Sequence, residues 1–121
     1  MTNAADSKQE IGRQGETYVA ALLRERGFLI VARNARAGRY EIDIIATRGR
    51  LLVFCEVRTR QHADFGAPAE SVGPKKQESL RLGARRWLEE HPGYGQHDVR
   101  FDVAGVTLKP QHIVDYYVDA F

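Results

Sequence analysis

The sequence predicts an α/β (α+β) fold whose elements follow the order α-β-β-β-α-β-β. Three observations predict this class. Apolar residues recur at helical spacing in two segments, one beginning near Ser7 and one near Pro74. Short apolar runs with strand-like alternation fill the rest of the chain. The third run, the second helix and the fourth run form a crossover, which is right-handed and sets its two strands parallel. We therefore expect a mixed central sheet flanked by helices.

Sequence signals place both helices. The first begins at a capping box, in which Ser7 is followed three residues later by Glu10, and it ends at Gly27. The second begins at Pro74, a residue suited to a first helical turn, and ends at about Glu90. Its expected inner face consists of Leu80, Ala84, Trp87 and Leu88.

Five strands are expected. They are residues 28–33, the two arms of a hairpin over residues 40–59, a run containing Val99, Phe101 and Val103, and residues 113–118. A turn over residues 34–39 precedes the hairpin, and a polar loop over residues 60–73 follows it.

The hairpin carries acids where strands normally carry apolar residues. A turn at Arg48-Gly49 pairs Asp43 with Phe54 and Glu41 with Glu56. Asp43 and Glu56 then become diagonal neighbours with Cα atoms roughly 7–8 Å apart. Because side chains alternate along a strand, one face shows Glu41, Asp43, Ile45, Leu52, Phe54, Glu56 and Arg58. The other face is apolar and consists of Ile42, Ile44, Ala46, Leu51, Val53, Cys55 and Val57.

Composition limits the class of protein. A chain of 121 residues suits one domain, which we place at residues 8–121 after a disordered N-terminus over residues 1–7. The single cysteine, Cys55, is expected to be a small core residue and cannot form an internal disulfide. The sequence has no apolar run of transmembrane length and no signal-peptide core at its start, so we expect no membrane partner and a cytoplasmic location.

Charge is informative only locally. The net charge is +2, but residues 33–60 hold seven arginines against three acids. Arginine presents a planar fork that suits phosphate. We name Arg36, Arg39 and Arg60 from this region as nucleic-acid-binding candidates, together with Lys75, Lys76 and Gln77 at the start of the second helix, where free N–H groups favour anions. The alternative is that these are ordinary surface residues.

Two carboxylates that share a face suggest a shared cation, because buried acids are costly without one. Their hard oxygen ligands suit Mg²⁺ or Mn²⁺. Such an ion could hold a phosphate oxygen and activate a water. Arg58 could stabilise charge that builds on the phosphate, but it cannot act as a base. The alternative is a solvated strand end where Glu56 pairs with a nearby arginine.

The remaining acids are assigned more loosely. Glu16 lies in the first helix, where the residue alone indicates a solvated position. We expect Glu41 to support the site or to pair with an arginine rather than to bind metal directly.

Several ordered motifs over residues 11–121 resemble those of the YraN-like uncharacterised family 0102. These motifs are Gly15-Glu16, Arg33-Asn34-x-Arg36, Glu41-Ile42-Asp43-Ile44-Ile45, Val53-Phe54-Cys55-Glu56-Val57-Arg58-x-Arg60, Ser71-Val72 with Lys76-Gln77, Arg100-Phe101-Asp102-Val103 and Ala120-Phe121. That family resembles the PD-(D/E)XK nuclease superfamily, which includes restriction endonucleases and Holliday-junction resolvases.

The resemblance implies a restriction endonuclease-like core with a metal-dependent phosphodiesterase site. It gives Asp43 the aspartate role, Glu56 the role of the second acid, Arg58 the place of the superfamily lysine, and Glu16 that of a further acid. Nucleases of this kind often pair to cut two strands, so a homodimer is left open. Two residues depart from the pattern: Tyr40 stands where a glycine is usual, and Arg58 replaces lysine.

The sequence therefore predicts a Mg²⁺- or Mn²⁺-dependent endonuclease that hydrolyses DNA phosphodiester bonds on branched or damaged DNA. Two alternatives remain open. One is a non-catalytic nucleic-acid-binding module on the same fold, and the other is a scaffolding protein whose acids only form salt bridges.

Overall fold

The structure is a computed structural model that describes residues 7–63 and 72–121. Its elements are α1 (Lys8–Glu25), β1 (Leu29–Ala37), β2 (Tyr40–Arg48), β3 (Leu51–His62), α2 (Pro74–Glu90), a short 3₁₀ turn η1 (Pro92–Tyr94), β4 (Asp98–Lys109) and β5 (Ile113–Tyr117). The predicted order α-β-β-β-α-β-β is therefore confirmed. No helix among these described residues is long and apolar enough to span a membrane.

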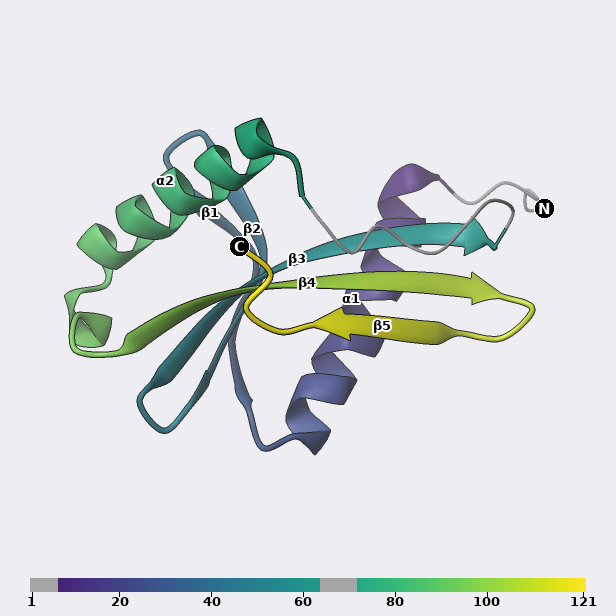
Figure 1. Ribbon diagram of the computed structural model, residues 1–121, viewed down its shortest axis with the longest axis horizontal. Coiled ribbons are helices and arrows are strands. Elements are labelled where there is room, and N and C mark those ends of the chain that lie inside the picture. Colours follow the sequence, from purple (N-terminus) through teal and green to yellow (C-terminus); the bar gives the residue numbers. More distant parts are fainter. Residues whose placement is uncertain (1–6, 64–71) are drawn as a thin grey trace.

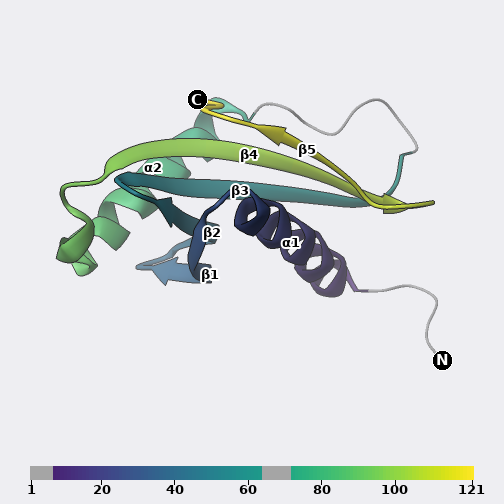
Figure 2. The same cartoon turned by 90° about the horizontal axis from the view of Figure 1, so that it is seen from below.

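One mixed sheet organises the molecule, with strand order β1-β2-β3-β4-β5 (Figure 1). The crossover through α2 sets β3 and β4 parallel, as predicted, and the other neighbours are antiparallel. Figure 2 shows α1 lying along one face of the sheet. The residues that pack under α1 and under α2 form two separate clusters on opposite faces.

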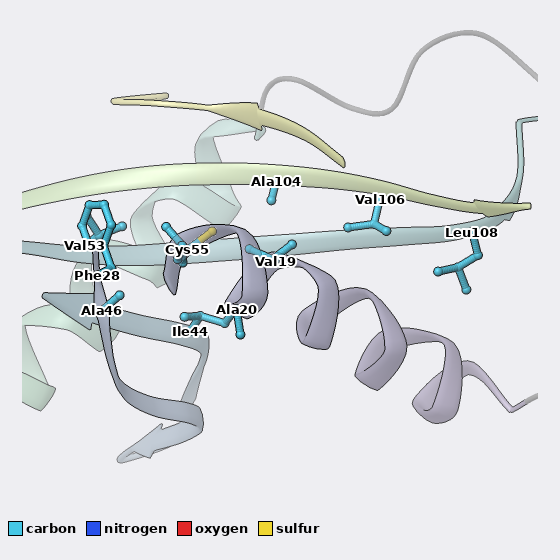
Figure 3. Packing of buried hydrophobic residues seen from close by; sticks show 11 residues of the cluster. Val19, Ala20, Phe28, Ile44, Ala46, Val53, Cys55, Ala104, Val106 and Leu108 are labelled. Atoms are coloured by element: carbon cyan, nitrogen blue, oxygen red, sulfur yellow. The ribbon is translucent and has the colours of Figure 1, made fainter. Parts of the chain in front are cut away.

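The α1 face holds the larger core. Val19 and Ala20 of α1 pack against Ile44, Val53, Cys55 and their neighbours on the sheet (Figure 3). Leu23 belongs to the same cluster. Cys55 is fully buried, which confirms its expected role as a core residue. Gly15 lets the helix approach closely, because a Cβ there would lie 1.8 Å from Thr59 Oγ1. This close approach brings the next residue, Glu16, down to the sheet.

The second helix packs over β1 and β2. Ala84 and Trp87 lie against Ile45, Leu52 and Phe54, so the predicted inner face of this helix is confirmed. A Cβ at Gly83 would lie 2.9 Å from the Cβ of Tyr40. The bulky residue that departs from the family pattern therefore packs under α2.

Helix ends were predicted more accurately than strand ends. The Ser7–Glu10 capping box is present, and Gly27 has a φ of +88°, which suits glycine. By contrast, β1 continues to Ala37, so the turn expected over residues 34–39 shrinks to Gly38-Arg39. Because β3 and β4 pair along their whole length, β4 runs well past Val103 and β3 reaches His62.

Two expectations fall largely on residues that the structure does not describe. The disordered N-terminus expected over residues 1–7 lies outside the described residues except for Ser7. The polar loop expected over residues 60–73 lies outside them at residues 64–71, and its first part belongs to β3.

The predicted hairpin register is wrong by two residues. Ile45, not Asp43, pairs with Phe54, and Arg48 pairs with Leu51. The turn is therefore at Gly49-Arg50, where Gly49 takes a φ of +60°. A shift of two keeps every side chain on its face, so Asp43 comes opposite Glu56 instead of diagonal to it.

The predicted apolar face is also wrong at one position. Ile44 packs in the α1 cluster, whereas Ile42 packs in the α2 cluster. Strand β2 therefore changes face across Asp43. The ladder pairs Arg33 with Ile44 and Ala35 with Ile42, which puts Asn34 opposite Asp43. Asn34 has a φ of +51°, so both strands of the β1–β2 pair are irregular at the same point.

Candidate active site

The candidate site lies where two strands part. The β2–β3 ladder ends at the pair Ile44–Cys55, and beyond it β3 continues beside β4 alone. In Figure 1 the β1–β2 pair turns away from the long β3–β4 pair. Asp43 Oδ2 accepts a hydrogen bond of 2.8 Å from the backbone N–H of Val57. The carboxylate thus takes up a donor that a continuing ladder would have used.

Glu56 is the second acid at this fork. It is 9% exposed, and its Oε2 lies 3.7 Å from Lys76 Nζ of α2 and 4.0 Å from Arg58 Nε. Charge-assisted hydrogen bonds are usually 2.7–2.9 Å long. Both cations therefore lie near Glu56 without closing on it, and Lys76 is the closer of the two.

The two carboxyl groups interact directly, and both have raised pKa values. Burial, followed by the negative charge of Asp43, raises the pKa of Glu56 to about 7. Burial also raises the pKa of Asp43, while the Val57 N–H and a hydrogen bond with Glu56 oppose the rise. Near neutral pH the pair therefore holds a proton for part of the time, because two adjacent buried negative charges are unfavourable.

Glu16 approaches the site from α1. It is 7% exposed, accepts a hydrogen bond of 2.9 Å from Asn34 Nδ2, and lies 3.7 Å from the guanidinium of Arg33. Burial raises its pKa, which the Asn34 hydrogen bond lowers in part and the charge of Asp43 raises further. The irregular Asn34 of β1 therefore fixes the orientation of an acid from a different element.

Two hollows adjoin the fork. Glu16, Asn34, Glu41 and Asp43 line one of about 380 Å³ on the α1 side. Glu41 also lines a second hollow of about 200 Å³, together with Arg39 and Lys76 on the α2 side. The exposed Glu41 thus lies between the two hollows, near the acids without being one of the buried pair.

The predicted nucleic-acid contacts divide into two groups. Arg36, Arg39, Lys75 and Lys76 are exposed near the fork. Arg60 and Gln77 have intramolecular partners: Arg60 Nε donates to Thr107 Oγ1 at 3.0 Å, and Gln77 Nε2 donates to the carbonyl of Val72 at 2.6 Å. The structure therefore gives Arg60 and Gln77 internal roles that the sequence did not indicate.

The donor set at the fork is small. Within residues 7–63 and 72–121, no group of three or more His, Cys, Asp or Glu side chains has a metal-binding arrangement. A pair of carboxylates suits an ion such as Mg²⁺, which proteins usually hold through one or two carboxylates while waters and substrate phosphates complete its shell. The residues fit that kind of site and do not form an all-protein cage.

Sequence reasoning missed three features of the molecule. Lys76 was predicted as a phosphate contact, but it also approaches Glu56. Asn34 appeared in a motif without a role, although asparagine is one of the few residues that tolerates a positive φ. Asp102 appeared only within a motif, without a role, yet it is fully buried. An acid between Phe101 and Val103 was the available signal for that burial.

Comparisons with known proteins point to the same family as the sequence motifs. The chain is 45% identical over 103 residues to a UPF0102 protein of Anaeromyxobacter dehalogenans, covering 85% of this chain and 76% of that protein. It is 38% identical to a UPF0102 protein of Acidothermus cellulolyticus over the full length of both. It is 39% identical to one of Dictyoglomus thermophilum, covering 95% and 99% of the two chains.

Among solved structures, Pyrococcus furiosus SfsA in complex with Ca²⁺ aligns with a TM-score of 0.39 at 11% identity. The alignment covers 93% of this chain and 64% of that one, so this chain spans less than two thirds of that protein. A likeness of this size carries no argument about fold or activity. The sequence model of the uncharacterised protein family UPF0102 matches residues 15–106. Together with the relatives of similar length, this match shows that the chain belongs to the uncharacterised protein family UPF0102.

Proposed function

We propose that this protein is a metal-dependent nuclease that hydrolyses phosphodiester bonds in DNA, with branched or damaged DNA as its substrate. The observation that carries the proposal is the Asp43–Glu56 pair. These two largely buried carboxyl groups interact directly, burial raises the pKa of both, and the charge of Asp43 raises that of Glu56 further. Among the described residues, the cations within 4.0 Å of Glu56 are Lys76 and Arg58, and neither closes on it. A divalent cation would relieve the cost of ionising this pair.

Asp43 and Glu56 would hold Mg²⁺ or Mn²⁺. The Val57 N–H keeps Asp43 Oδ2 in place at 2.8 Å, so this carboxylate is already oriented. When bound, such an ion supplies neutralising charge for a phosphate oxygen and makes a bound water more acidic. Glu16, held by Asn34 beside the same hollow, would orient water on the α1 side.

Lys76 and Arg58 would act on the phosphate. Both lie within about 4 Å of Glu56, and their side chains are 46% and 37% exposed, so each can reach solvent. Neither closes on the carboxylate, and each could donate to a phosphate oxygen as negative charge builds there. An ammonium group therefore stands beside Glu56 even though Arg58 occupies the motif position of the superfamily lysine.

The exposed cations beside the fork would hold the flanking phosphates. Three cations are exposed here: Arg36 on β1, Arg39 on the β1–β2 turn and Lys75 at the beginning of α2. Contacts of this kind position nucleic acid without reading its sequence. They make binding strongly salt-dependent.

Cleavage of labelled DNA tests the proposal. Forked, single-stranded and duplex DNA should be cut in the presence of Mg²⁺ or Mn²⁺ and left intact in EDTA. Asp43→Asn should lower the rate by about a hundredfold or more, since removing one electrostatic contribution in an active site commonly costs that much. The matched control is Asp98→Asn, which removes an exposed acid at the beginning of β4. Cutting that persists in Asp43→Asn, or that proceeds equally in EDTA, would show that the proposal is wrong.

A second candidate function is a non-catalytic nucleic-acid-binding module. Two observations favour it: Arg58 in place of lysine, and the absence of a third metal-binding side chain within the part of the chain that the structure describes. It predicts salt-sensitive DNA binding that is unchanged by metal. If Arg58→Lys also gives no cutting with any divalent metal while binding persists, this candidate replaces the nuclease.

A further inference from the structure

An apolar groove lies between α2 and β4, away from the acid pair. Its volume is about 500 Å³ and its floor is formed by Ala84, Leu88, Val99 and Phe101. The groove exists because α2 packs over β1 and β2 and leaves the first part of β4 uncovered (Figure 1). Val99 is 41% exposed as a result. Concave, mostly apolar hollows with a few polar groups at their edge are the usual form of a binding site.

The rim of the groove is basic. Arg81 and Arg85 line it, against the single acid Glu89. Arg81 donates to Gln77 at 3.5 Å and lies over the Phe121 ring at 5.1 Å. Arg85 has no ion-pair or hydrogen-bond partner within residues 7–63 and 72–121. Its neighbour Arg86 differs, because its Nε lies 3.0 Å from Glu90. An unpaired guanidinium beside an apolar floor suits an anion that carries an apolar or aromatic part.

The two elements that form the groove, α2 and the sheet, also extend to the acid pair. On α2, Gln77, Arg81 and Arg85 follow each other at intervals of four residues, about 6 Å per step. This row begins next to Lys76, which approaches Glu56. On the sheet, Phe101 pairs with Phe54, two residues before Glu56. A strand of nucleic acid at the fork could therefore continue along α2 into the groove.

We propose that the α2–β4 groove binds an unpaired segment of the nucleic acid, an inference that rests on the proposed function. The Phe101 ring already stacks with Phe54 and Phe121, at centroid distances of 5.8 and 5.1 Å. Bases therefore lie against Val99, Leu88 and the part of Phe101 that lines the groove, while Arg81 and Arg85 contact phosphates. Aromatic and apolar platforms that follow a basic row bind single strands, because the faces of unpaired bases are available for stacking. In a duplex those faces are covered by neighbouring base pairs. The groove therefore selects DNA that carries a single-stranded arm.

Fluorescence anisotropy tests this inference in EDTA, so that metal-dependent chemistry plays no part. A short labelled oligothymidylate is titrated with wild type, Arg85→Ala, Val99→Asp and the control Arg86→Ala. We expect about tenfold weaker binding for Arg85→Ala and for Val99→Asp, in line with the usual loss of stacking or phosphate contacts. Arg86→Ala should bind like wild type. Thermal unfolding of each variant verifies that it is folded.

Three results would overturn the groove proposal. Arg85→Ala and Val99→Asp could bind the oligonucleotide as tightly as wild type. The two substitutions could weaken binding of a blunt duplex as much as binding of the single strand, which would show that the groove has no preference for unpaired bases. Polyglutamate could displace the oligonucleotide as well as unlabelled oligothymidylate does, which would indicate an acidic peptide as the occupant. None of these results depends on cutting. A protein that binds through the groove but never cuts DNA contradicts the nuclease proposal alone.

Discussion

Two regions of this molecule contain buried carboxylates. In one region hydrogen bonds and an ion pair compensate the carboxylate, and in the other they do so only in part. Asp102 on β4 is fully buried. It accepts two hydrogen bonds of 2.9 Å from Arg100, one from Nε and one from a terminal nitrogen. It also accepts one from Tyr116 Oη at 2.5 Å and one from the N–H of Asp119 at 2.9 Å. The hydrogen bonds between Arg100 and Asp102 raise the pKa of Arg100, so the guanidinium stays charged. Every oxygen of Asp102 is satisfied by the protein itself.

The acids at the fork lack this compensation. Asp43 receives one backbone donor, Glu56 has cations at 3.7 and 4.0 Å, and the two carboxyl groups face each other. Asp102 joins β4 to β5 and the C-terminal residues through these hydrogen bonds. Asp43 and Glu56 have fewer partners within the protein, which is the property that the proposed metal site would use.

The largest expected effect of a single substitution is at Asp102. Asp102→Ala leaves Arg100 and Tyr116 without their acceptor, and breaking a buried ion pair of this kind usually lowers the free energy of unfolding by about 3–5 kcal/mol. Urea unfolding measures the loss. Tyr116→Phe, which removes one donor, should lose about 1 kcal/mol. A change at Asp102 no larger than that of Tyr116→Phe would show that the compensated cluster does not stabilise the fold.

A smaller effect is expected at Glu56, where ionisation lowers the free energy of unfolding, whereas the hydrogen-bonded Asp102 raises it. Its pKa is about 7 in the folded protein, against 4.5 as its ordinary value. Between these pH values the folded state binds more protons than the unfolded state, so stability falls as pH rises and levels off above about pH 7. The loss is at most about 3 kcal/mol. Urea unfolding in EDTA from pH 4 to 8 should show this decline in wild type.

The same unfolding measurement can be repeated with a substitution at Glu56 and with added metal. Glu56→Gln cannot ionise, so its stability should decline less over this range. Mg²⁺ or Mn²⁺ should restore wild-type stability chiefly above pH 7, where both acids are charged. A wild-type curve that rises from pH 4.5 to 7 would contradict the picture of an uncompensated pair.

The smallest effect is expected at Asn34, which stabilises one acid by a single hydrogen bond. Asn34→Gly keeps the φ of +51° without strain but removes the hydrogen bond to Glu16. Asn34→Ala removes the same bond and adds about 1 kcal/mol of strain in the left-handed region. Alanine should therefore lower the free energy of unfolding more than glycine, as measured by thermal or urea unfolding. Equal losses would show that this backbone conformation does not matter for stability.

Local patterns in the sequence determined most of the architecture. The capping box at Ser7, the proline at Pro74 and the apolar spacing of both helices act within one or two turns, so they are readable without tertiary contacts. The strands were recognised for the same reason, although their ends were not. The length of a strand depends on the strands it pairs with, and β3 and β4 pair from Leu51–Asp98 to His62–Lys109 although 35 residues of chain separate them.

The candidate site was predicted in part. Alternation along a strand placed Asp43 and Glu56 on one face, and an error of two residues in register left that face unchanged. The sequence did not reveal the change of face at Asp43, the hydrogen bond from Asn34 to Glu16, or the approach of Lys76. Each of these joins residues from different elements, and no local pattern encodes the distance between them.

The sequence by itself determined the order of elements, the two helix faces and the presence of acids within apolar strands, because these depend on periodicity and on neighbours in the chain. Only the tertiary structure decided which buried acid is satisfied and which is not. The strand register brings Arg100 and Tyr116 to Asp102, while the parting of β2 and β3 leaves Asp43 facing Glu56. The reason is that compensation of a buried charge depends on groups within a few ångströms of it, and folding chooses those groups from distant parts of the chain.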